Sequence, residues 1–274
     1  MMKAIVVHSF GGPDVMTYED APMPAPGKGE VLIRVYAAGV NPSDGITRSG
    51  YETVPAKIRP SIRPSLPMIP GWDVSGVVAA VGESTRIFKV GDAVYGLVSF
   101  PQQGPAGAYA EYMVAPEEHL ARKPDAIDYL HAAALPMAVL TAWQALDKAD
   151  IHAGHRVLVN GASGGVGHMA IQLAKIRGAT VIGTASGKNE LFVKQFEVDQ
   201  FIDYTQSRLT DIDAPVDVVI DTVGGENGEQ LLDLIKPGGK LVPIFYSPYS
   251  AEKGLWLVFV AAGAAVYVKR SRRS

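Results

Sequence analysis

The stretch best suited to chemistry is a glycine-rich turn between an apolar run and a helix-forming run. The run and turn read Arg156-Val-Leu-Val-Asn-Gly-Ala-Ser-Gly-Gly-Val-Gly167, and His168-Met-Ala-Ile-Gln-Leu-Ala-Lys175 follows directly. A buried strand that ends in small residues and leads into a helix lets the backbone approach a pyrophosphate, and the helix N-terminus offers amide donors to the anion. The pattern predicts a dinucleotide-binding turn, with an ordinary glycine-rich turn as the alternative.

Within this turn, the individual residues have separate expected roles. Aligned to G-x-G-x-x-G, the turn has Ala162 in place of the first glycine. Gly164 and Gly165 are expected to let the backbone approach the pyrophosphate, and Gly167 is expected to let the helix pack closely on the strand. No Gly-Lys-Ser/Thr follows, so the turn is not a P-loop. The expected phosphate-binding set is Ala162, Ser163, Gly164, Gly165, Val166 and Gly167.

The residues after the second strand indicate which dinucleotide is bound. A site for NAD places Asp or Glu about 20 residues beyond the glycines, where it binds the ribose 2′-hydroxyl. This chain has no carboxylate there, and Ser186 and Lys188 can instead donate to a 2′-phosphate. Tyr204, at the end of the next strand, can add its hydroxyl or flank the adenine. The sequence therefore favours NADPH over NADH, with a solvated surface lysine as the alternative interpretation of Lys188.

Composition limits the class of protein. The chain has 274 residues, of which 47% are hydrophobic, a formal net charge of −3 and no cysteine. A slightly acidic chain lacks the basic face that a nucleic-acid-binding protein needs, so no nucleic-acid partner is expected. Without cysteine there can be no disulfide, no iron–sulfur cluster and no zinc site built from thiolates.

Two patterns of residues divide the chain near Pro124 and predict two domains. Residues 1–124 read as a β domain, and residues 125–274 alternate strand and helix patterns, as a parallel doubly wound sheet does. The strands expected in the first domain are Lys3–His8, Val31–Ala38, Val74–Val81 and Ala93–Leu97. The second domain is expected to have helices at 129–149 (broken at Pro136), 166–177, 191–196 and 228–235, and strands at 156–160, 180–185, 201–204, 216–222 and 240–245.

Near the C-terminus, Leu255–Val268 forms a second apolar run, with the basic residues 269–273 after it. As a helix this run would span roughly 21 Å, short of the ~30 Å hydrocarbon core of a bilayer. A buried strand, 255–260, followed by a helix piece is therefore expected, with a membrane-associated segment as a weaker alternative. No secretory signal is visible at the N-terminus, so the expected location is the cytoplasm.

Several further segments occur in a fixed order along the chain: Gly39–Asp44, Pro70–Val78, Lys89–Gly96, Gly107–Tyr112, Leu135–Trp143 and the turn at Ala162. Together they resemble the zinc-independent quinone oxidoreductase (zeta-crystallin-like) branch of the medium-chain dehydrogenase/reductase family. The resemblance implies a GroES-like β domain followed by a Rossmann domain that binds NADPH. It also implies hydride transfer to a quinone or an α,β-unsaturated carbonyl compound, and a homodimer.

The same resemblance assigns roles to three side chains. It implies that Asn41 lies near the nicotinamide ribose, that Thr141 forms a hydrogen bond close by, and that Tyr51 reaches the substrate carbonyl. From the residues alone, Asn41 could instead shape a turn, Thr141 could be an ordinary helix residue, and Tyr51 could contact nothing. Some relatives have a tyrosine where this chain has Ile46, which leaves the identity of a tyrosine proton donor open.

The strand order indicates two further cofactor-contacting positions, and the resemblance bears on whether the protein has a metal site. Val223 and Phe245 come after the fourth and fifth strands, whose carboxyl ends are expected to face the cofactor; Asp221 could equally cap a turn there. Zinc-using relatives place Cys where this chain has Ser43 or Asp44, and Gly-His-Glu where it has Gly71-Trp-Asp73. The six histidines of the chain are scattered along the sequence, so no metal site is expected.

Relatives in this family continue for several dozen residues past the sixth strand, with a segment that returns to the β domain. Against that pattern this chain is expected to be shortened at its C-terminus. Two functions are therefore expected as alternatives. The first is an NADPH-dependent reductase of quinones or enones. The second is an NADPH-binding protein with little or no catalysis, such as a sensor, a crystallin-like binder or a defective shortened chain.

Overall fold

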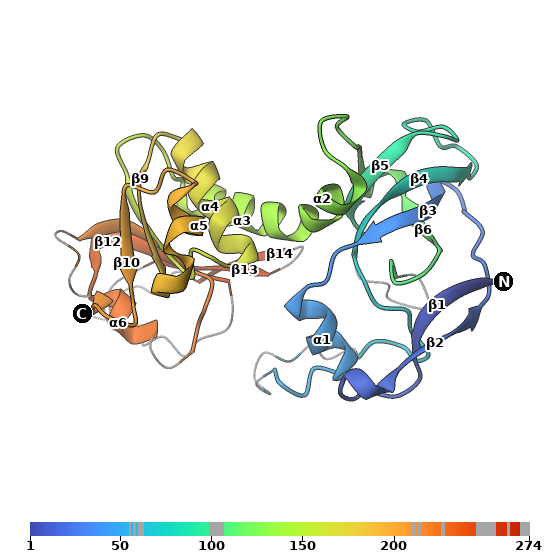
Figure 1. The fold of residues 1–274 in the computed structure, drawn as a ribbon, viewed down its shortest axis with the longest axis horizontal. Coiled ribbons are helices and arrows are strands. Elements are labelled where there is room, and N and C mark those ends of the chain that lie inside the picture. The colour runs from blue at the N-terminus through green and yellow to red at the C-terminus, as the bar shows by residue number, and fades with distance from the viewer. Residues whose placement is uncertain are drawn as a thin grey trace. The chain divides into compact units, whose positions relative to one another are not determined.

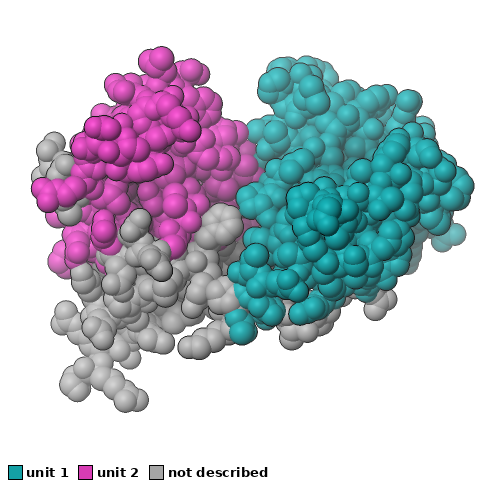
Figure 2. Space-filling view, turned by 60° about the horizontal axis from the view of Figure 1, so that its bottom comes forward, with its two compact units in different colours: residues 1–137 teal, residues 138–274 magenta. Residues whose placement is uncertain are grey.

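The computed structural model divides the chain into two compact units, Met1–Met137 and Ala138–Ser274, which Figure 2 colours separately. We call them the β unit and the α/β unit. Each has its own sheet and its own hydrophobic core. The residues described are 1–54, 56, 59, 63–98, 107–209, 212, 215–225, 228–244, 256–261 and 264–268. For residue 229 and for 256–261 and 264–268, the description covers the backbone alone.

The β unit is built on a five-stranded antiparallel sheet and a separate antiparallel hairpin (Figure 1). Val31, Leu32 and Ile33 are all buried along one strand, and Val31 and Ile33 join Val74 in the core. The strands predicted here are confirmed to within one residue at each end. The sheet order is β6 (Tyr112–Pro116), β3 (Glu30–Ala38), β4 (Asp73–Val81), β5 (Ala93–Leu97) and β7 (Leu120–Arg122), and the hairpin is β1 (Met2–Val7) with β2 (Met16–Ala21).

One helix of the β unit was not expected from the sequence. Helix α1 (Pro42–Arg48) follows Asn41, whose backbone N–H donates to the carboxylate of Asp44 at 2.6 Å. Proline at the first helical position and an acidic residue at the third are both helix-start signals. The signal Asn-Pro-Ser-Asp was therefore present in the sequence, within a segment that the surrounding strand pattern made look entirely β.

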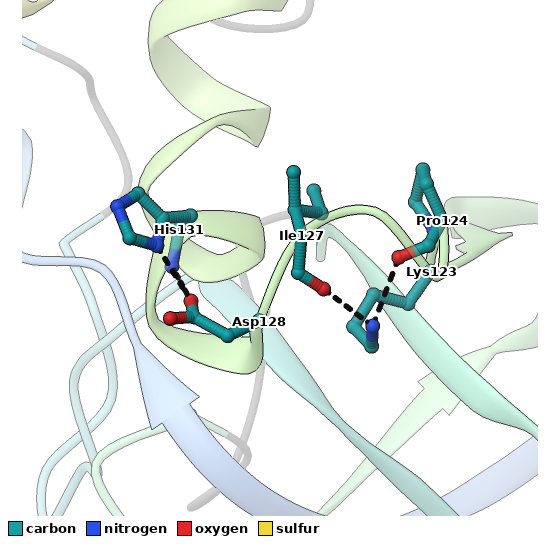
Figure 3. Close-up of polar contacts among 5 residues, drawn as sticks. All are labelled: Lys123, Pro124, Ile127, Asp128 and His131. Carbon is teal, nitrogen blue, oxygen red and sulfur yellow. Dashed lines mark hydrogen bonds and ion pairs between the residues drawn. The ribbon is translucent and has the colours of Figure 1, made fainter.

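At the expected domain boundary, directly after β7, the chain forms a helix whose N-terminus is capped (Figure 3). The Lys123 ammonium donates to the carbonyl oxygens of Pro124 and Ile127, at 2.9 and 2.6 Å. Asp128 then caps helix α2 (Tyr129–Ala134), because its carboxylate accepts the backbone N–H of His131 at 2.8 Å. Helix α2 packs against β3 and β4, so it belongs to the compact β unit. The expected boundary between folding domains at 124/125 stays a prediction.

The α/β unit begins within helix α3 (Pro136–Ala149), and the expected break at Pro136 is confirmed. Its sheet has seven described strands. The first six of them along the chain run parallel to one another. In chain order these six are arranged 3-2-1-4-5-6, the order of a dinucleotide-binding fold. The sheet runs β10 (Gln200–Asp203), β9 (Thr180–Ala185), β8 (Arg156–Asn160), β11 (Val216–Asp221), β12 (Ile235–Pro243), β13 (Trp256–Ala261) and β14 (Ala264–Val268).

Helices cover both faces of this sheet. On one face Val157 and Val159 of β8 pack with residues of α3 and of helix α4 (Gly165–Ile176). On the other face Leu158 packs with residues of helix α6 (Gly228–Leu232). Apolar residues on both sides of a strand are typical of a parallel sheet. The remaining short elements are helix α5 (Glu190–Lys194) and the 3₁₀ turns η1 (Pro13–Val15), η2 (Glu117–His119) and η3 (Gly187–Asn189).

The apolar C-terminal run is confirmed in part and corrected in part. Its first portion forms β13, the expected sixth strand, which pairs in parallel with β12. The expected helix piece is wrong, because 264–268 forms β14, paired antiparallel with β13. Val266, Tyr267 and Val268 are β-branched or aromatic, which favours a strand over a helix. Among the described helices, none combines the length and the apolar composition needed to cross a bilayer.

Candidate cofactor and active site

A cavity of about 880 Å³ opens at the carboxyl ends of the strands of the α/β unit. Its walls come from residues that end or follow β8, β9, β10 and β11, which include the two strands where the sheet order reverses. Ligands of open α/β sheets bind at this switch point. The lining residues are Asn160, Gly161, Ser163, Gly164, Ala185, Ser186, Asn189, Tyr204, Ser207, Arg208, Leu209, Thr222, Val223, Gly224, Gln230 and Asp233.

The glycine-rich turn has the close contacts that the sequence predicts, together with one that it missed. A Cβ on Gly167 would collide with the carbonyl oxygen of Gly161, so this position requires glycine. A Cβ on Gly165 would meet no atom within 4 Å, so the backbone there is open to a ligand. Gly161 has φ +80°, in the left-handed region that favours glycine. The G-x-G-x-x-G alignment overlooked it, although a glycine directly after a buried strand was the available signal.

The start of helix α4 fits an anionic group. Gly164 precedes the helix, and its N–H donates to the carbonyl of Gly161 at 2.9 Å. No acidic side chain lies in the first turn, and no side chain caps it. The first amides of a helix lack intrahelical partners and carry the positive end of the helix dipole. Together with the open backbone at Gly165, they fit the pyrophosphate of a dinucleotide.

After β9 and β10, the polar side chains that line the cavity differ from the expected set. Asn189 donates to the hydroxyls of Ser163 and Ser186, at 3.1 and 3.2 Å, and so fixes the loop after β9 against the turn. Tyr204 lines the cavity as expected, but Lys188 is exposed and is not among its lining residues. Arg208 lines the cavity and was missed, since nothing in the local sequence pattern separates it from a surface arginine.

A carboxylate lies closer to this loop than the sequence suggested. Asp203, at the end of β10, accepts hydrogen bonds from the hydroxyl and the backbone N–H of Thr205, at 2.7 and 2.9 Å. These bonds, with a further one from the N–H of Gly187, hold the pKa of Asp203 below its usual value. Asp203 does not line the cavity, so its charge is held by the Thr205 turn rather than presented to a ligand.

In the β unit, Asn41 lies between two buried carboxyl groups. Its side-chain amide donates to Asp73 at 2.9 Å, and its backbone N–H donates to Asp44 at 2.6 Å. Asp73 also accepts the N–H of Met137 at 3.0 Å, and both aspartates are buried. Burial raises the pKa of Asp73 to about 6, and the hydrogen bond from the Asn41 amide opposes this rise. Burial raises the pKa of Tyr109 above its usual value, and the Asp44 charge adds to this effect.

A second cavity, of about 420 Å³, belongs to the β unit alone and is lined in part by Asn41, Asp44, Arg48 and Tyr109. Tyr51, the expected catalytic tyrosine, is buried, has φ +65° and does not line this cavity. Burial raises the pKa of Tyr51, so its hydroxyl keeps its proton at neutral pH.

Three other expected assignments remain untested. Thr141 is half-buried within α3, and its role stays a prediction. Phe245 lies outside the described residues. Among the described residues, no group of three His, Asp or Glu side chains converges as a metal site would require. The expected absence of a metal likewise stays a prediction.

The raised pKa of Asp73 predicts how stability changes with pH. Its pKa rises from 3.8 to about 6, so between these values the folded protein binds a proton that the unfolded chain releases. The free energy of unfolding should therefore fall as the pH rises through this window, by up to about 3 kcal/mol from this group. Asp73→Asn should remove that fall, measured by urea unfolding at several pH values.

Asp92→Asn is the control of opposite sign. The Lys89 backbone N–H and Arg122 lower the pKa of Asp92, so its stabilising contribution is present at neutral pH and disappears in acid. A difference between wild type and Asp73→Asn that stays constant with pH would contradict the assignment of the raised pKa.

The geometry agrees with comparisons to known proteins. Residues 27–125 match the model for the alcohol dehydrogenase GroES-like domain, and residues 165–267 match the model for zinc-binding dehydrogenase. The NADPH-dependent alkenal/one oxidoreductase of Arabidopsis thaliana is 40% identical over 249 residues, which cover 89% of this chain and 62% of that protein. The mouse quinone oxidoreductase is 36% identical over 257 residues, which cover 89% of this chain and 73% of that protein.

Solved structures give the same result. The quinone oxidoreductase from Coxiella burnetii superposes with a TM-score of 0.79 at 40% identity, covering 92% of this chain and 77% of that one. The chain spans about 62% of the length of the plant relative, so it corresponds to part of that protein. Two domain models match the chain in the expected order, and the match to the mouse relative covers most of that protein's length. These findings show the family of the chain. It belongs to the medium-chain dehydrogenase/reductase family, among relatives named quinone oxidoreductase.

Proposed function

We propose that the protein is an oxidoreductase that uses NADPH to reduce a quinone or an α,β-unsaturated carbonyl compound without zinc. The observation that carries this proposal is the cavity at the switch point of the α/β sheet, which is lined by the glycine turn and by Ser186, Tyr204 and Arg208. The relatives named alkenal/one oxidoreductase and quinone oxidoreductase support the substrate class. The nicotinamide, when bound, supplies the hydride.

The chain's own residues would hold the cofactor by its anionic groups. The turn from Ala162 to Gly167 and the first amides of α4 would bind the pyrophosphate. Arg208, with Ser186 and Tyr204, would bind the 2′-phosphate, because a guanidinium forms charge-assisted, bidentate hydrogen bonds to phosphate. Val223, which is 60% exposed, would contact the cofactor from the loop after β11.

In the β unit, the hydrogen bonds favour a binding role for Asn41 over a proton-donating one. Its side-chain N–H already donates to Asp73, which leaves its carbonyl oxygen to accept a hydrogen bond, such as one from a ribose hydroxyl. On the resemblance alone, Tyr51, which is buried and keeps its proton, would be the donor toward the substrate carbonyl, and Thr141 would assist on the cofactor side. Without a Lewis acid, such hydrogen bonds and substrate positioning must polarise the acceptor.

Two features support a zinc-independent reaction. The sequence has no cysteine, and Ser43 and Asp44 stand where zinc-using relatives have a cysteine ligand. The Ser43 hydroxyl donates to the sulfur of Met137 at 3.3 Å, while Asp44 accepts the Asn41 N–H. Both groups therefore serve the packing of α1.

The proposal includes a cytoplasmic homodimer. Strand β14 stands last in the described order of the α/β sheet. An edge strand offers unpaired N–H and C=O groups to a second copy, which is the physical basis for expecting association.

The choice of cofactor can be tested by two substitutions. The sequence assigns the 2′-phosphate to Lys188, and the structure places Arg208 in the cavity wall instead. Arg208→Ala should weaken NADPH binding by about 1–3 kcal/mol through loss of a charge-assisted contact, and should leave NADH binding nearly unchanged. Lys188→Ala should have the smaller effect, and Lys194→Ala on helix α5 is the matched control. Equal losses for NADPH and NADH, measured by fluorescence titration, would contradict this assignment.

The proposed activity itself is tested by turnover. The purified chain is mixed with NADPH and either a benzoquinone or a 2-alkenal, and the loss of NADPH absorbance is followed against a protein-free blank. Oxidation above the blank, with a smaller rate from NADH, is the expected result. Binding of NADPH with no oxidation of it by any acceptor would favour the alternative, a protein that binds the cofactor without catalysis.

A further inference from the structure

A chain of polar side chains crosses three neighbouring strands of the α/β sheet near their carboxyl ends. Thr184 is the next-to-last residue of β9, the half-buried Asn160 ends β8, and Asp221 ends β11. The Thr184 hydroxyl donates to the Asn160 side-chain carbonyl at 2.8 Å, and the Asn160 amide donates to the Asp221 carboxylate at 2.7 Å. Thr184 and Asp221 are completely buried. We call these three residues the strand-end network.

The chemistry of Asp221 fixes the direction of every bond in the strand-end network. Both of its oxygens accept backbone N–H groups of the loop, so Asp221 acts as an acceptor here. The NH₂ group of Asn160, the donor of that amide, is therefore the group that faces it. The carbonyl of Asn160 is then turned to Thr184, whose hydroxyl donates to it. A reversed Asn160 amide would leave two acceptors facing each other in a buried site, which is costly. The carboxylate therefore selects one conformation of the Asn160 side chain.

This network is bonded to both walls of the cavity. Asp221 accepts the backbone N–H of Val223 at 3.1 Å and that of Gly224 at 3.1 and 3.2 Å, which holds the loop 222–224. On the other side, the Thr184 carbonyl accepts the N–H of Ala162 at 2.8 Å, and the Thr184 hydroxyl accepts that of Gly161 at 3.4 Å. One network thus holds both the glycine turn and the loop 222–224 beside it.

Thr222 closes the connection between the two walls. Its hydroxyl and its N–H both donate to the backbone carbonyl of Asn160, at 2.8 and 3.1 Å. A Cβ on Gly161 would collide with the Thr222 hydroxyl, so turn and loop are packed against each other. A movement of the loop would have to break its bonds to Asn160, and a movement of the turn would have to break its bonds to Thr184.

We propose that Asp221 and Thr184 are positioning residues that, through Asn160, hold the glycine turn and the loop 222–224 in the conformation that binds the dinucleotide. Neither lines the cavity, so neither acts by touching the ligand. The inference rests on the proposed function only in that the ligand is NADPH. Its distinctive consequence is that cofactor affinity depends on where one buried carboxyl group sits and on which way one amide is turned.

The first test is Asp221→Asn, measured as the dissociation constant for NADPH by fluorescence titration. The Asp221 Oδ1 atom accepts from Asn160, Val223 and Gly224, and its Oδ2 atom accepts from Gly224 as well. An NH₂ group in place of either oxygen therefore faces at least one N–H donor. We expect NADPH binding to weaken by about tenfold or more, since an unsatisfied buried polar group is costly. Asn160→Asp should weaken it comparably, because it places two carboxylates face to face.

The exchanged pair Asn160→Asp with Asp221→Asn provides the decisive variant. Asp at 160 can accept from Thr184 and from the amide at 221, while the oxygen of Asn at 221 takes the place of Oδ2 and accepts the N–H of Gly224. The bond between positions 160 and 221 is restored, so the double variant should bind NADPH more tightly than either single variant. A role in folding alone would instead make the two substitutions lower the melting temperature without this specific recovery of binding.

Asp217→Asn is the matched control. Asp217 lies near the other end of β11, accepts the N–H of Arg156 at 2.8 Å, and pairs with Lys236. It faces away from the switch-point cavity and does not line it. Its replacement should leave the NADPH dissociation constant unchanged, whatever it does to the melting temperature.

Thr184→Val carries the test if Asp221→Asn does not fold. It removes one buried hydroxyl at the far end of the network, at nearly constant volume, and is expected to weaken NADPH binding severalfold. NADPH affinity equal to wild type in folded Thr184→Val or Asp221→Asn would overturn the inference, as would an exchanged pair no better than its single variants. Wild type that binds neither NADPH nor NADH would instead overturn the proposed function.

Discussion

The hydrogen bond between Asn160 and Asp221 joins β8 to β11, the two strands at which the order of the α/β sheet reverses. At such a point the connections leave to opposite sides, and the strand ends are left with polar groups that no further ladder satisfies. Here side chains of the strand-end network and of Thr222 form hydrogen bonds with these groups. The turn is bonded to Thr184 and the loop 222–224 is bonded to Asp221, and the Asn160 side chain joins these two residues.

The β unit solves a related problem with different chemistry. Its buried polar group is a pair of carboxyls, Asp44 and Asp73, with Asn41 donating to both from its backbone and its side chain. Burial raises the pKa of both carboxyl groups, and that of Asp73 rises to about 6. The Asn41 amide is held by Asp73 as the Asn160 amide is held by Asp221. In both units a buried carboxylate fixes the direction of an asparagine that borders a cavity.

Much of this architecture could be predicted from residue patterns. The strand–turn–helix sequence from Arg156 to Lys175 predicted the phosphate-binding turn, and the strand pattern predicted the parallel sheet, because both depend on local periodicity and on glycine. Helix α1 was missed although its Asn-Pro-Ser-Asp start was visible, because the strand signals on either side outweighed it. Strand β14 was missed because an alanine-rich run is compatible with a helix until its pairing with β13 is known.

The side chains around the cavity were harder to predict than the turn. Arg208 and Lys188 have the same charge and similar surroundings in the sequence, and only the fold shows which one lines the cavity. Asp221 was expected to face the cofactor or to cap a turn, and the structure gives it the second role, as acceptor for Val223 and Gly224. Its link to Asn160 spans 61 residues of sequence, which no local pattern can reveal.

The central claim is that NADPH binds between the glycine turn and the loop 222–224. Amide hydrogen exchange of the full chain, with and without NADPH, tests this most directly. Exchange should slow in 161–167 and 222–224 when NADPH is present, and should not change in 236–240, which line a separate cavity with residues at the other end of the sheet. Unchanged exchange in both cavity segments at saturating NADPH, or slowing confined to other parts of the chain, would contradict the account.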